Sequence, residues 1–159
     1  MKISFIKCSM VDLNILNEFY IQMSIDEGRL QFPNVPKKEM LLDLKKHKKE
    51  RKIGFLKELK ATKRNLWYFI KVENKIAGFI HAQINKNDKK FAELEKVYIL
   101  KEFRGKGLAV KLCKFIFRLL KKKGVKKIQS GIFALNKPSI RLHEYLGFKP
   151  YSVKLRKVL

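Results

Sequence analysis

A turn that carries two glycines, between an extended apolar run and a long helical pattern, constrains this chain more than any other part of its sequence. The turn lies within residues 101–109, follows the apolar run at 91–100, and holds Gly105 and Gly107. Glycine lets the backbone turn sharply, and a helix that begins there leaves several N–H groups unpaired at the positive end of its dipole. The turn is therefore predicted to bind an anion.

Charged side chains at this turn narrow the class of anion. Arg104 and Lys106 place positive charge beside the free amides, which favours phosphate or pyrophosphate over a single carboxylate. Two phosphate-binding motifs are excluded by spacing: the P-loop needs four residues between its glycines, and the dinucleotide motif needs a third glycine where this chain has Val110. A plain strand-to-helix turn remains the alternative.

The composition fits one globular domain, residues 1–159. Hydrophobic residues make up 46% of the chain, with 12 Phe and 5 Tyr, which argues against disorder. No apolar run approaches the roughly 20 residues that cross a bilayer. Residues 1–7 lack a positively charged region followed by a long apolar block, so secretion is not expected. Cys8 and Cys113 lack metal-ligand spacing, so we expect two reduced thiols, no metal site and a cytoplasmic location.

A net charge of +24 is the least ordinary feature of the composition. Positive charge is spread along the chain rather than confined to a tail, and only the first 35 residues are slightly acidic. Two interpretations stay open. The lysines reflect a compositional bias and are simply solvated, or they form a basic surface that contacts RNA, a ribosome or another acidic macromolecule.

Apolar periodicity and turn residues predict strands and helices along the whole chain. The strand after the long helix should lie parallel to the strand before it, because a helix connects them. The expected elements are a strand at 2–7, a helix from Ser9 or Asp12 to about Ser24, a loop at 26–36, a helix from about Pro36 to Lys52, a short helical turn within 53–64, a hairpin of strands at 66–72 and 76–84, a strand at 91–100, a helix from Lys106 or Gly107 to about Lys123, a strand at 126–133, a helix from Asn136 to Gly147 and a last strand at 148–155.

Two motifs and this order of elements resemble the GNAT family of N-acetyltransferases. Arg104, Gly107 and Ala109 are similar to the Arg-x-x-Gly-x-Ala loop with which the family binds the pyrophosphate of acetyl-CoA, and residues 136–148 resemble a second family motif, Asn-x-x-Ala/Ser-x-x-Leu-Tyr-x-x-x-Gly-Phe. The resemblance spans the chain. It implies an α/β (α+β) fold with a mixed, mostly antiparallel central sheet of six to seven strands, a splayed parallel pair and flanking helices.

The resemblance also implies a reaction, in which an acetyl group moves from acetyl-CoA to a primary amine by direct attack on the thioester. In the family, the cofactor arm enters the gap of the splayed pair and bonds the backbone of the strand before the loop. That strand also supplies the oxyanion donor, here the N–H of Tyr98 or Ile99. The implied cofactor-binding residues are Val97, Tyr98, Ile99, Arg104, Gly105, Lys106, Gly107, Leu108, Ala109, Asn136 and Ser139.

One position departs from the family pattern. The family's tyrosine, which is thought to protonate the departing thiolate, is replaced by His143. Tyr145 lies about 200° further around the helix and should face away from the site. We expect His143 to be the general acid, because an imidazole titrates near neutrality, and the alternative is a polar residue that only lines the channel.

A proton acceptor is also required, since only a neutral amine can attack the thioester. Glu93 and Glu95 alternate with Val97 and Ile99, so the four side chains are expected on one face of the strand. Glu95 is the first candidate base and Glu93 the second. The alternative is that both are exposed carboxylates paired with nearby lysines, namely Lys86, Lys89 or Lys90.

The acceptor itself is not specified by the sequence. Asp26 and Glu27, in the predicted loop at 26–36, could hold a cationic amine such as a polyamine, a lysine side chain or a peptide N-terminus. The lysine-rich second helix would suit an anionic partner instead. A competing hypothesis is therefore a catalytically weak module that binds RNA, but the intact phosphate loop favours an enzyme; monomer and homodimer are both open.

Overall fold

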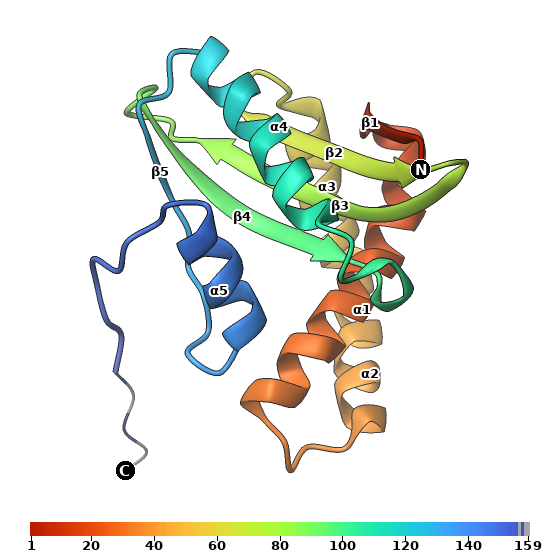
Figure 1. Ribbon diagram of the computed structural model, residues 1–159. Coiled ribbons are helices and arrows are strands. Elements are labelled where there is room, and N and C mark those ends of the chain that lie inside the picture. Colours follow the sequence, from red (N-terminus) through yellow and green to blue (C-terminus); the bar gives the residue numbers. More distant parts are fainter. Residues whose placement is uncertain (156, 158–159) are drawn as a thin grey trace.

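A twisted sheet with helices on both faces forms the framework of the molecule (Figure 1). The computed structural model describes residues 1–155 and 157, and within them the sheet has five strands in chain order. Neighbouring strands pair antiparallel except the last two, which are parallel as predicted. The strands are β1 (Ile3–Lys7), β2 (Asn65–Val72), β3 (Lys75–Ile84), β4 (Phe91–Ile99) and β5 (Lys127–Gln129).

Helices cover the two faces unequally (Figure 1). One face packs on a single long helix, α4, and the opposite face on α1 and α3, while α5 lies beside the end of the sheet where β5 is. The helices are α1 (Leu13–Gln31), α2 (Lys37–Lys46), α3 (Lys48–Lys60), α4 (Leu108–Lys122) and α5 (Lys137–Tyr145), with short 3-10 turns η1 (Met10–Asp12) and η2 (Lys101–Phe103).

The apolar stripe of α4 explains why this helix docks so firmly. Five apolar side chains that recur every three or four residues are buried, while lysines are exposed on the outer face. The buried residues of this stripe are Leu108, Leu112, Cys113, Ile116 and Leu120. On the other face of the sheet an aromatic layer forms the core, in which Trp67 and Phe79 stack 5.8 Å apart and Phe19 of α1 meets Phe79 edge-on. The central strands β2, β3 and β4 are thus covered on both faces, while the outer strands β1 and β5 are more exposed.

Helical structure extends further in the first third of the chain than the sequence predicts. The expected loop at 26–36 is wrong, because α1 continues to Gln31, and the short turn expected within 53–64 is part of α3. Gly28 lies inside α1, where a Cβ would sit 3.2 Å from the sulfur of Met40. Close packing against α2 therefore outweighs the low helix propensity of glycine at this position.

The last predicted strands are shorter than expected or missing. The strand expected at 126–133 ends at Gln129, and residues 148–155 form no strand, so the count of six to seven strands is corrected to five in the described chain. Pro150 cannot donate to a ladder, and the alternating side chains of Tyr151, Val153 and Leu155 are 75%, 82% and 93% exposed. Alternation alone made this segment look like a strand, but no neighbouring strand pairs with it.

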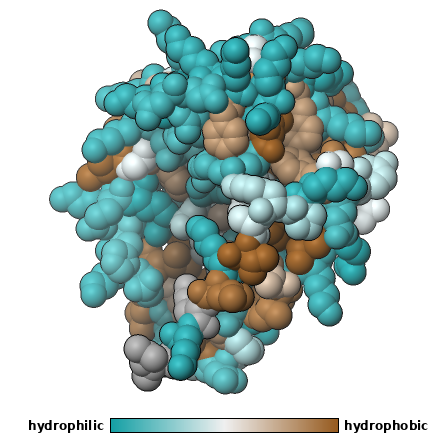
Figure 2. All heavy atoms as spheres, turned by 90° about the vertical axis from the view of Figure 1, so that its left-hand side faces the viewer, coloured by the Kyte–Doolittle hydropathy of each residue, from teal (hydrophilic) through white to brown (hydrophobic). Residues whose placement is uncertain are grey.

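Figure 2 shows the face that carries β5 and α5, where hydrophilic side chains predominate and apolar ones gather in the lower half. In the described part of the chain, no helix is both long enough and apolar enough to span a membrane.

Two glycines give matched tests of this packing. A Cβ on Gly78 would come within 2.2 Å of the Tyr98 carbonyl oxygen and 2.7 Å of Ile99, whereas a Cβ on Gly54, inside α3, would meet nothing within 4 Å. Gly78→Ala should lower the free energy of unfolding by about 2 kcal/mol or more, and Gly54→Ala should raise it by about 0.5–1 kcal/mol. Urea denaturation measures both. A Gly78→Ala protein as stable as wild type would contradict the described β3–β4 pairing.

Candidate active site

The predicted anion-binding turn is open and has the required backbone geometry. Gly105 and Gly107 have φ angles of 77° and 69°, in the left-handed region, and a Cβ on either would meet nothing within 4 Å. The first hydrogen bond of α4 runs from Lys111 N–H to the Gly107 carbonyl, 3.1 Å. The N–H groups of the first turn of α4 therefore have no partner within the helix and face a site where an anion can bind.

Arg104 does not extend into this open turn. Its Nε donates to the Ile99 carbonyl (2.8 Å), and its guanidinium donates to the Asp26 carboxylate on α1 (2.9 Å). Asp26 also accepts from Tyr98 Oη (2.9 Å) and Lys101 Nζ (3.0 Å). Burial alone raises the pKa of Asp26, but these bonds outweigh burial and hold its pKa below the usual value. Asp26 thus clamps α1 to the start of the anion-binding turn, and is not free to hold an amine.

A bulge in β4 overturns one prediction about side-chain direction. His81 of β3 pairs with Lys96 and Ala82 pairs with Leu94, so Glu95 has no partner in β3. Before the bulge, Ala92 and Leu94 face the α4 core. After it, the side chains that face this core are those of Val97 and Ile99. The expectation that Val97 and Ile99 share a face with the two glutamates is therefore wrong, although Glu93 and Glu95 do lie beside each other.

The backbone of β4 has an open edge along its second half. Parallel pairing with β5 stops at Glu93 and Gln129, while β4 continues six residues further to Ile99. Leu100 N–H donates to Ala77 in β3 (2.9 Å), and successive residues of a strand direct their N–H and C=O groups to opposite edges. The peptide groups of Val97 and Ile99 therefore face the open edge, and those of Tyr98 face β3.

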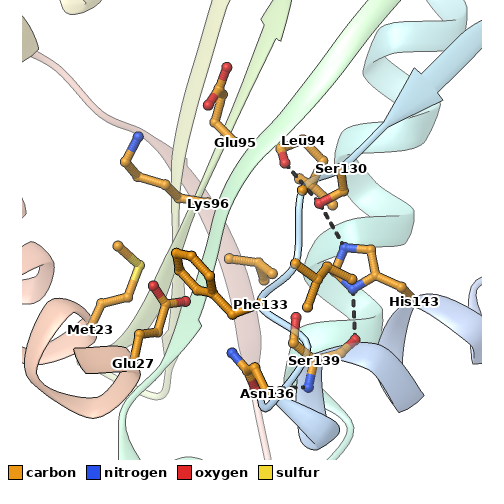
Figure 3. Close-up of a pocket in the computed structure, with 13 residues that line it drawn as sticks. Met23, Glu27, Leu94, Glu95, Lys96, Ser130, Phe133, Asn136, Ser139 and His143 are labelled. Carbon is orange, nitrogen blue, oxygen red and sulfur yellow. Dashed lines mark hydrogen bonds between the residues drawn. The ribbon is translucent and has the colours of Figure 1, made fainter. Parts of the chain in front are cut away.

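A cavity of about 220 Å³ lies beside this open edge and brings five of the predicted residues together (Figure 3). They are Glu95, Val97, Asn136, Ser139 and His143. Glu27, Lys96 and Glu95 lie on one side of the cavity in Figure 3, and Ser130, Ser139 and His143 on the other, with Phe133 between them. The residues of the anion-binding turn lie beyond the far end of β4 and do not line it.

Helix α5 fixes the orientation of His143. Asn136 caps this helix by accepting from Ser139 N–H (3.2 Å), and one turn further His143 is 4% exposed while Tyr145, as expected, faces solvent with 70% exposure. His143 Nδ1 lies 2.8 Å from the Ser139 carbonyl and Nε2 lies 3.1 Å from Ser130 Oγ. Burial lowers the pKa of His143, and the bond to Ser139 opposes that shift in part.

Two carboxylates with raised pKa values, Glu27 and Glu95, line the opposite side of the cavity, and a third, Glu58, lies near Glu95 without lining it. Burial raises the pKa of Glu27 and of Glu58 on α3, and Lys96 offsets both shifts in part. Burial and a hydrogen bond with Glu93 raise the pKa of Glu95. Within the described residues neither Glu93 nor Glu95 forms a salt bridge; Glu93 accepts from Gln129 (2.7 Å). The alternative of pairing with lysines of the preceding turn is therefore not formed.

Three residues of this site were not found from the sequence. Ser130 was hidden inside a predicted strand, and Lys96 and Glu58 are two among many charged residues. No motif marks them. Ser130 and Lys96 line the cavity from the end of β5 and from β4, and Glu58 of α3 lies near Glu95 without lining the cavity. In the part of the chain that is described, no group of three or more His, Cys, Asp or Glu side chains is placed to hold a metal ion.

Comparison with known proteins supports the geometric assignment. Residues 32–148 match the model of the acetyltransferase (GNAT) family. Among curated proteins, the chain is 35% identical over 68 residues to the uncharacterized N-acetyltransferase YjgM of Escherichia coli (strain K12). That match covers 43% of this chain and 41% of the relative's length.

Solved structures show the same fold. The PaiA N-acetyltransferase of Thermoplasma acidophilum in complex with coenzyme A superposes with a TM-score of 0.79 and 20% identity, over 97% of this chain and 94% of that one. AAC(6')-Iy in complex with the bisubstrate analogue CoA-S-monomethyl-acetylneamine gives a TM-score of 0.67 and 20% identity over the full length of both chains. Neither comparison supports the alternative of an RNA-binding module.

The clamp at Asp26 can be measured by a double-mutant cycle. Asp26→Asn and Arg104→Gln should each lower the free energy of unfolding, and the double variant should lose less than their sum, with a coupling of about 0.5–1 kcal/mol at pH 7. Because the pKa of Asp26 is lowered, this coupling is present above the ordinary value of 3.8 and is lost as the pH falls through the lower folded-state value. Strictly additive losses at pH 7 would show that Arg104 does not act through Asp26.

Proposed function

This chain belongs to the GNAT family of acetyltransferases, and from that premise we propose that it transfers the acetyl group of acetyl-CoA to a primary amine by direct attack on the thioester. The observation that carries the proposal is the open turn at Gly105 and Gly107, placed at the end of a strand whose outer edge is free. A diphosphate fits the amides of the turn, and an extended amide-bearing arm fits the free edge. The cavity beside that edge is where the thioester and the amine would meet.

The assignment of cofactor contacts follows from the backbone. The amides of residues 105–110 hold the pyrophosphate, and Lys106, which is exposed at the turn, adds charge to them. Arg104 acts on the turn through Asp26 and Ile99 instead of bonding phosphate. The oxyanion donor is a peptide N–H on the free edge, which makes Val97 or Ile99 the donor and removes Tyr98; Val97 is the one that lines the cavity.

A thiol-release assay tests the proposal. Acetyl-CoA and a panel of primary amines should give coenzyme A at a rate that depends on the amine, and calorimetry should detect acetyl-CoA binding that Gly107→Val weakens, because a Cβ is strained at this φ. Release without dependence on any amine in the panel, together with absence of acetyl-CoA binding, would remove the proposal.

Glu95 has the properties of the proton acceptor. It lies at the bulge in β4 and borders the cavity, with an exposed carboxylate that is directed away from Phe133 in Figure 3. Its raised pKa brings the carboxylate closer to the range in which it accepts a proton from an ammonium effectively. Glu93 lies beside Glu95, and its carboxylate already accepts a hydrogen bond from Gln129, which makes Glu93 the second candidate for the proton acceptor.

Glu95→Gln should lower kcat/KM by about 10²-fold and flatten the acid limb of the pH–rate profile. The sign follows from the raised pKa: the base is active when ionised, so the wild-type rate falls as the pH drops through that pKa. Glu93→Gln should cost less, and Glu18→Gln, an exposed site on α1, should leave the profile unchanged. An unaltered profile for Glu95→Gln would mean that another group takes the proton.

The acceptor that fits this cavity carries positive charge. Glu27 lines it from α1, and Lys96 lowers in part the pKa of Glu27, of Glu58 and of Glu95, so its charge acts on all three carboxylates. The Lys96 ammonium lies 5.8 Å above the Trp67 ring, a position that aromatic faces and carboxylates together favour for alkylammonium groups. One cation among three carboxylates leaves an excess of negative charge, which favours an amine with a second cationic group.

Glu27→Gln and Lys96→Met should therefore move the acceptor KM in opposite directions. With 1,4-diaminobutane as acceptor, the first should raise KM and the second should lower it, because one removes a negative charge and the other a positive charge from the same site. The KM for acetyl-CoA should change in neither variant. A rise in acceptor KM in both variants would indicate lost packing instead of charge recognition.

A further inference from the structure

Both ring nitrogens of His143 are already engaged. Nδ1 lies 2.8 Å from the Ser139 carbonyl, which can only accept, so Nδ1 must carry a proton. Nε2 lies 3.1 Å from Ser130 Oγ, and the imidazole is 4% exposed. His143 thus presents no free nitrogen to the cavity, and a direct transfer from this imidazole to a departing thiolate has no open path.

Ser130 has one hydroxyl hydrogen and two neighbours that could accept it. Its Oγ lies 3.1 Å from the Leu94 carbonyl and 3.1 Å from His143 Nε2. When His143 is neutral, Nε2 is an acceptor and competes with Leu94 for this hydrogen. When His143 is protonated, Nε2–H donates to Ser130 and the hydroxyl turns to Leu94 or to a group in the cavity. The direction of the Ser130 hydroxyl is therefore set by the protonation state of His143.

Position favours Ser130 as the group that reaches the cavity. It follows β5 directly, opposite the point at which β4 and β5 part, it lines the cavity, and it is less buried than the imidazole behind it. We propose that the Ser130 hydroxyl is the group that protonates the departing thiolate, with His143 behind it as the proton source. This inference rests on the proposed function, because it assigns a step of that reaction.

The step balances with one proton. The hydroxyl hydrogen of Ser130 forms the S–H bond as the thiolate leaves, and the Nε2 hydrogen of the His143 imidazolium moves to Ser130 Oγ. The serine ends as a hydroxyl and the histidine ends neutral with its Nδ1 hydrogen still on the Ser139 carbonyl. His143 then takes a proton from solvent.

The surroundings of His143 set the sign of the pH dependence. The charged groups that line the same cavity are Glu27 on α1 and Glu95 and Lys96 on β4, while the ring of Phe148 packs edge-on against the imidazole at 4.9 Å. The route needs the imidazolium, so kcat falls as the pH rises through the pKa of His143, which burial places below 6.5. A tyrosine at this position, with an ordinary pKa near 10, should move that limb to higher pH.

The pH dependence of kcat in three variants tests the proposal. Ser130→Ala should lower kcat by about 10²-fold and abolish the alkaline limb, whereas Ser130→Thr, which keeps a hydroxyl, should retain the limb. Ser130→Ala combined with His143→Ala should be no slower than the slower single variant, because two residues on one proton path act as a unit. Ser4→Ala, at an exposed position of β1, is the control.

Calorimetric binding of acetyl-CoA by Ser130→Ala separates this inference from the proposed function. If Ser130→Ala still binds acetyl-CoA but turns over slowly, with a kcat that no longer falls at alkaline pH, proton transfer through Ser130 is supported. An unchanged kcat and alkaline limb in Ser130→Ala, or a loss in the double variant equal to the product of the single losses, overturns it while acetyl transfer stands. Lack of turnover by the wild-type protein with every amine overturns both.

Discussion

The site depends on the point at which β4 stops pairing with β5. Up to Glu93 the two strands share a ladder, and beyond it β4 runs six residues with one edge paired to β3 and no described strand on the other. On that second edge the carbonyls of Leu94 and Ile99 accept from the side chains of Ser130 and Arg104. A free strand edge in a protein interior needs hydrogen-bond partners, so this edge favours a ligand that brings its own amide groups. The bulge at Glu95 adds to the effect, because it reverses the facing of the residues that follow it and so keeps Val97 and Ile99 on the α4 core.

Charge is distributed unevenly between surface and cavity. The chain carries +24 overall, yet three carboxylates, Glu27, Glu58 and Glu95, approach the cavity with Lys96 as their nearby cation. A fourth, Asp26, is occupied by a clamp to Arg104, Lys101 and Tyr98. Neighbouring residues of α1 thus contact two parts of the site, since Asp26 bonds Arg104 at the glycine turn and Glu27 lines the cavity. The high net charge describes the outer surface and gives no guide to the polarity of the site.

Part of the fold and the site could be read from residue patterns, because local rules govern them. Left-handed glycines at a strand-to-helix turn, the buried stripe of α4 and the cap at Asn136 each follow from a few adjacent residues. Other predictions were wrong because contacts between residues far apart in the sequence set the length of a helix, the pairing of a strand or the direction of a side chain. The helix extension to Gln31 depends on Met40, the missing strand at 148–155 on the lack of a pairing neighbour, and the facing of Val97 and Ile99 on a bulge that period-two alternation cannot reveal.

The sequence by itself determined the order of the strands and helices up to α5, the glycine turn before α4 and the presence of a histidine in place of the expected tyrosine, because each is a property of residues close together in the chain. Only the tertiary structure decided what those residues do to one another. It brought Arg104 into a hydrogen bond with Asp26, 78 positions away. It also placed both ring nitrogens of His143 at hydrogen-bond distance, one from the Ser139 carbonyl and the other from the Ser130 hydroxyl. Hydrogen-bond partners are set by distance and direction in space, and no local pattern of residue types contains that information.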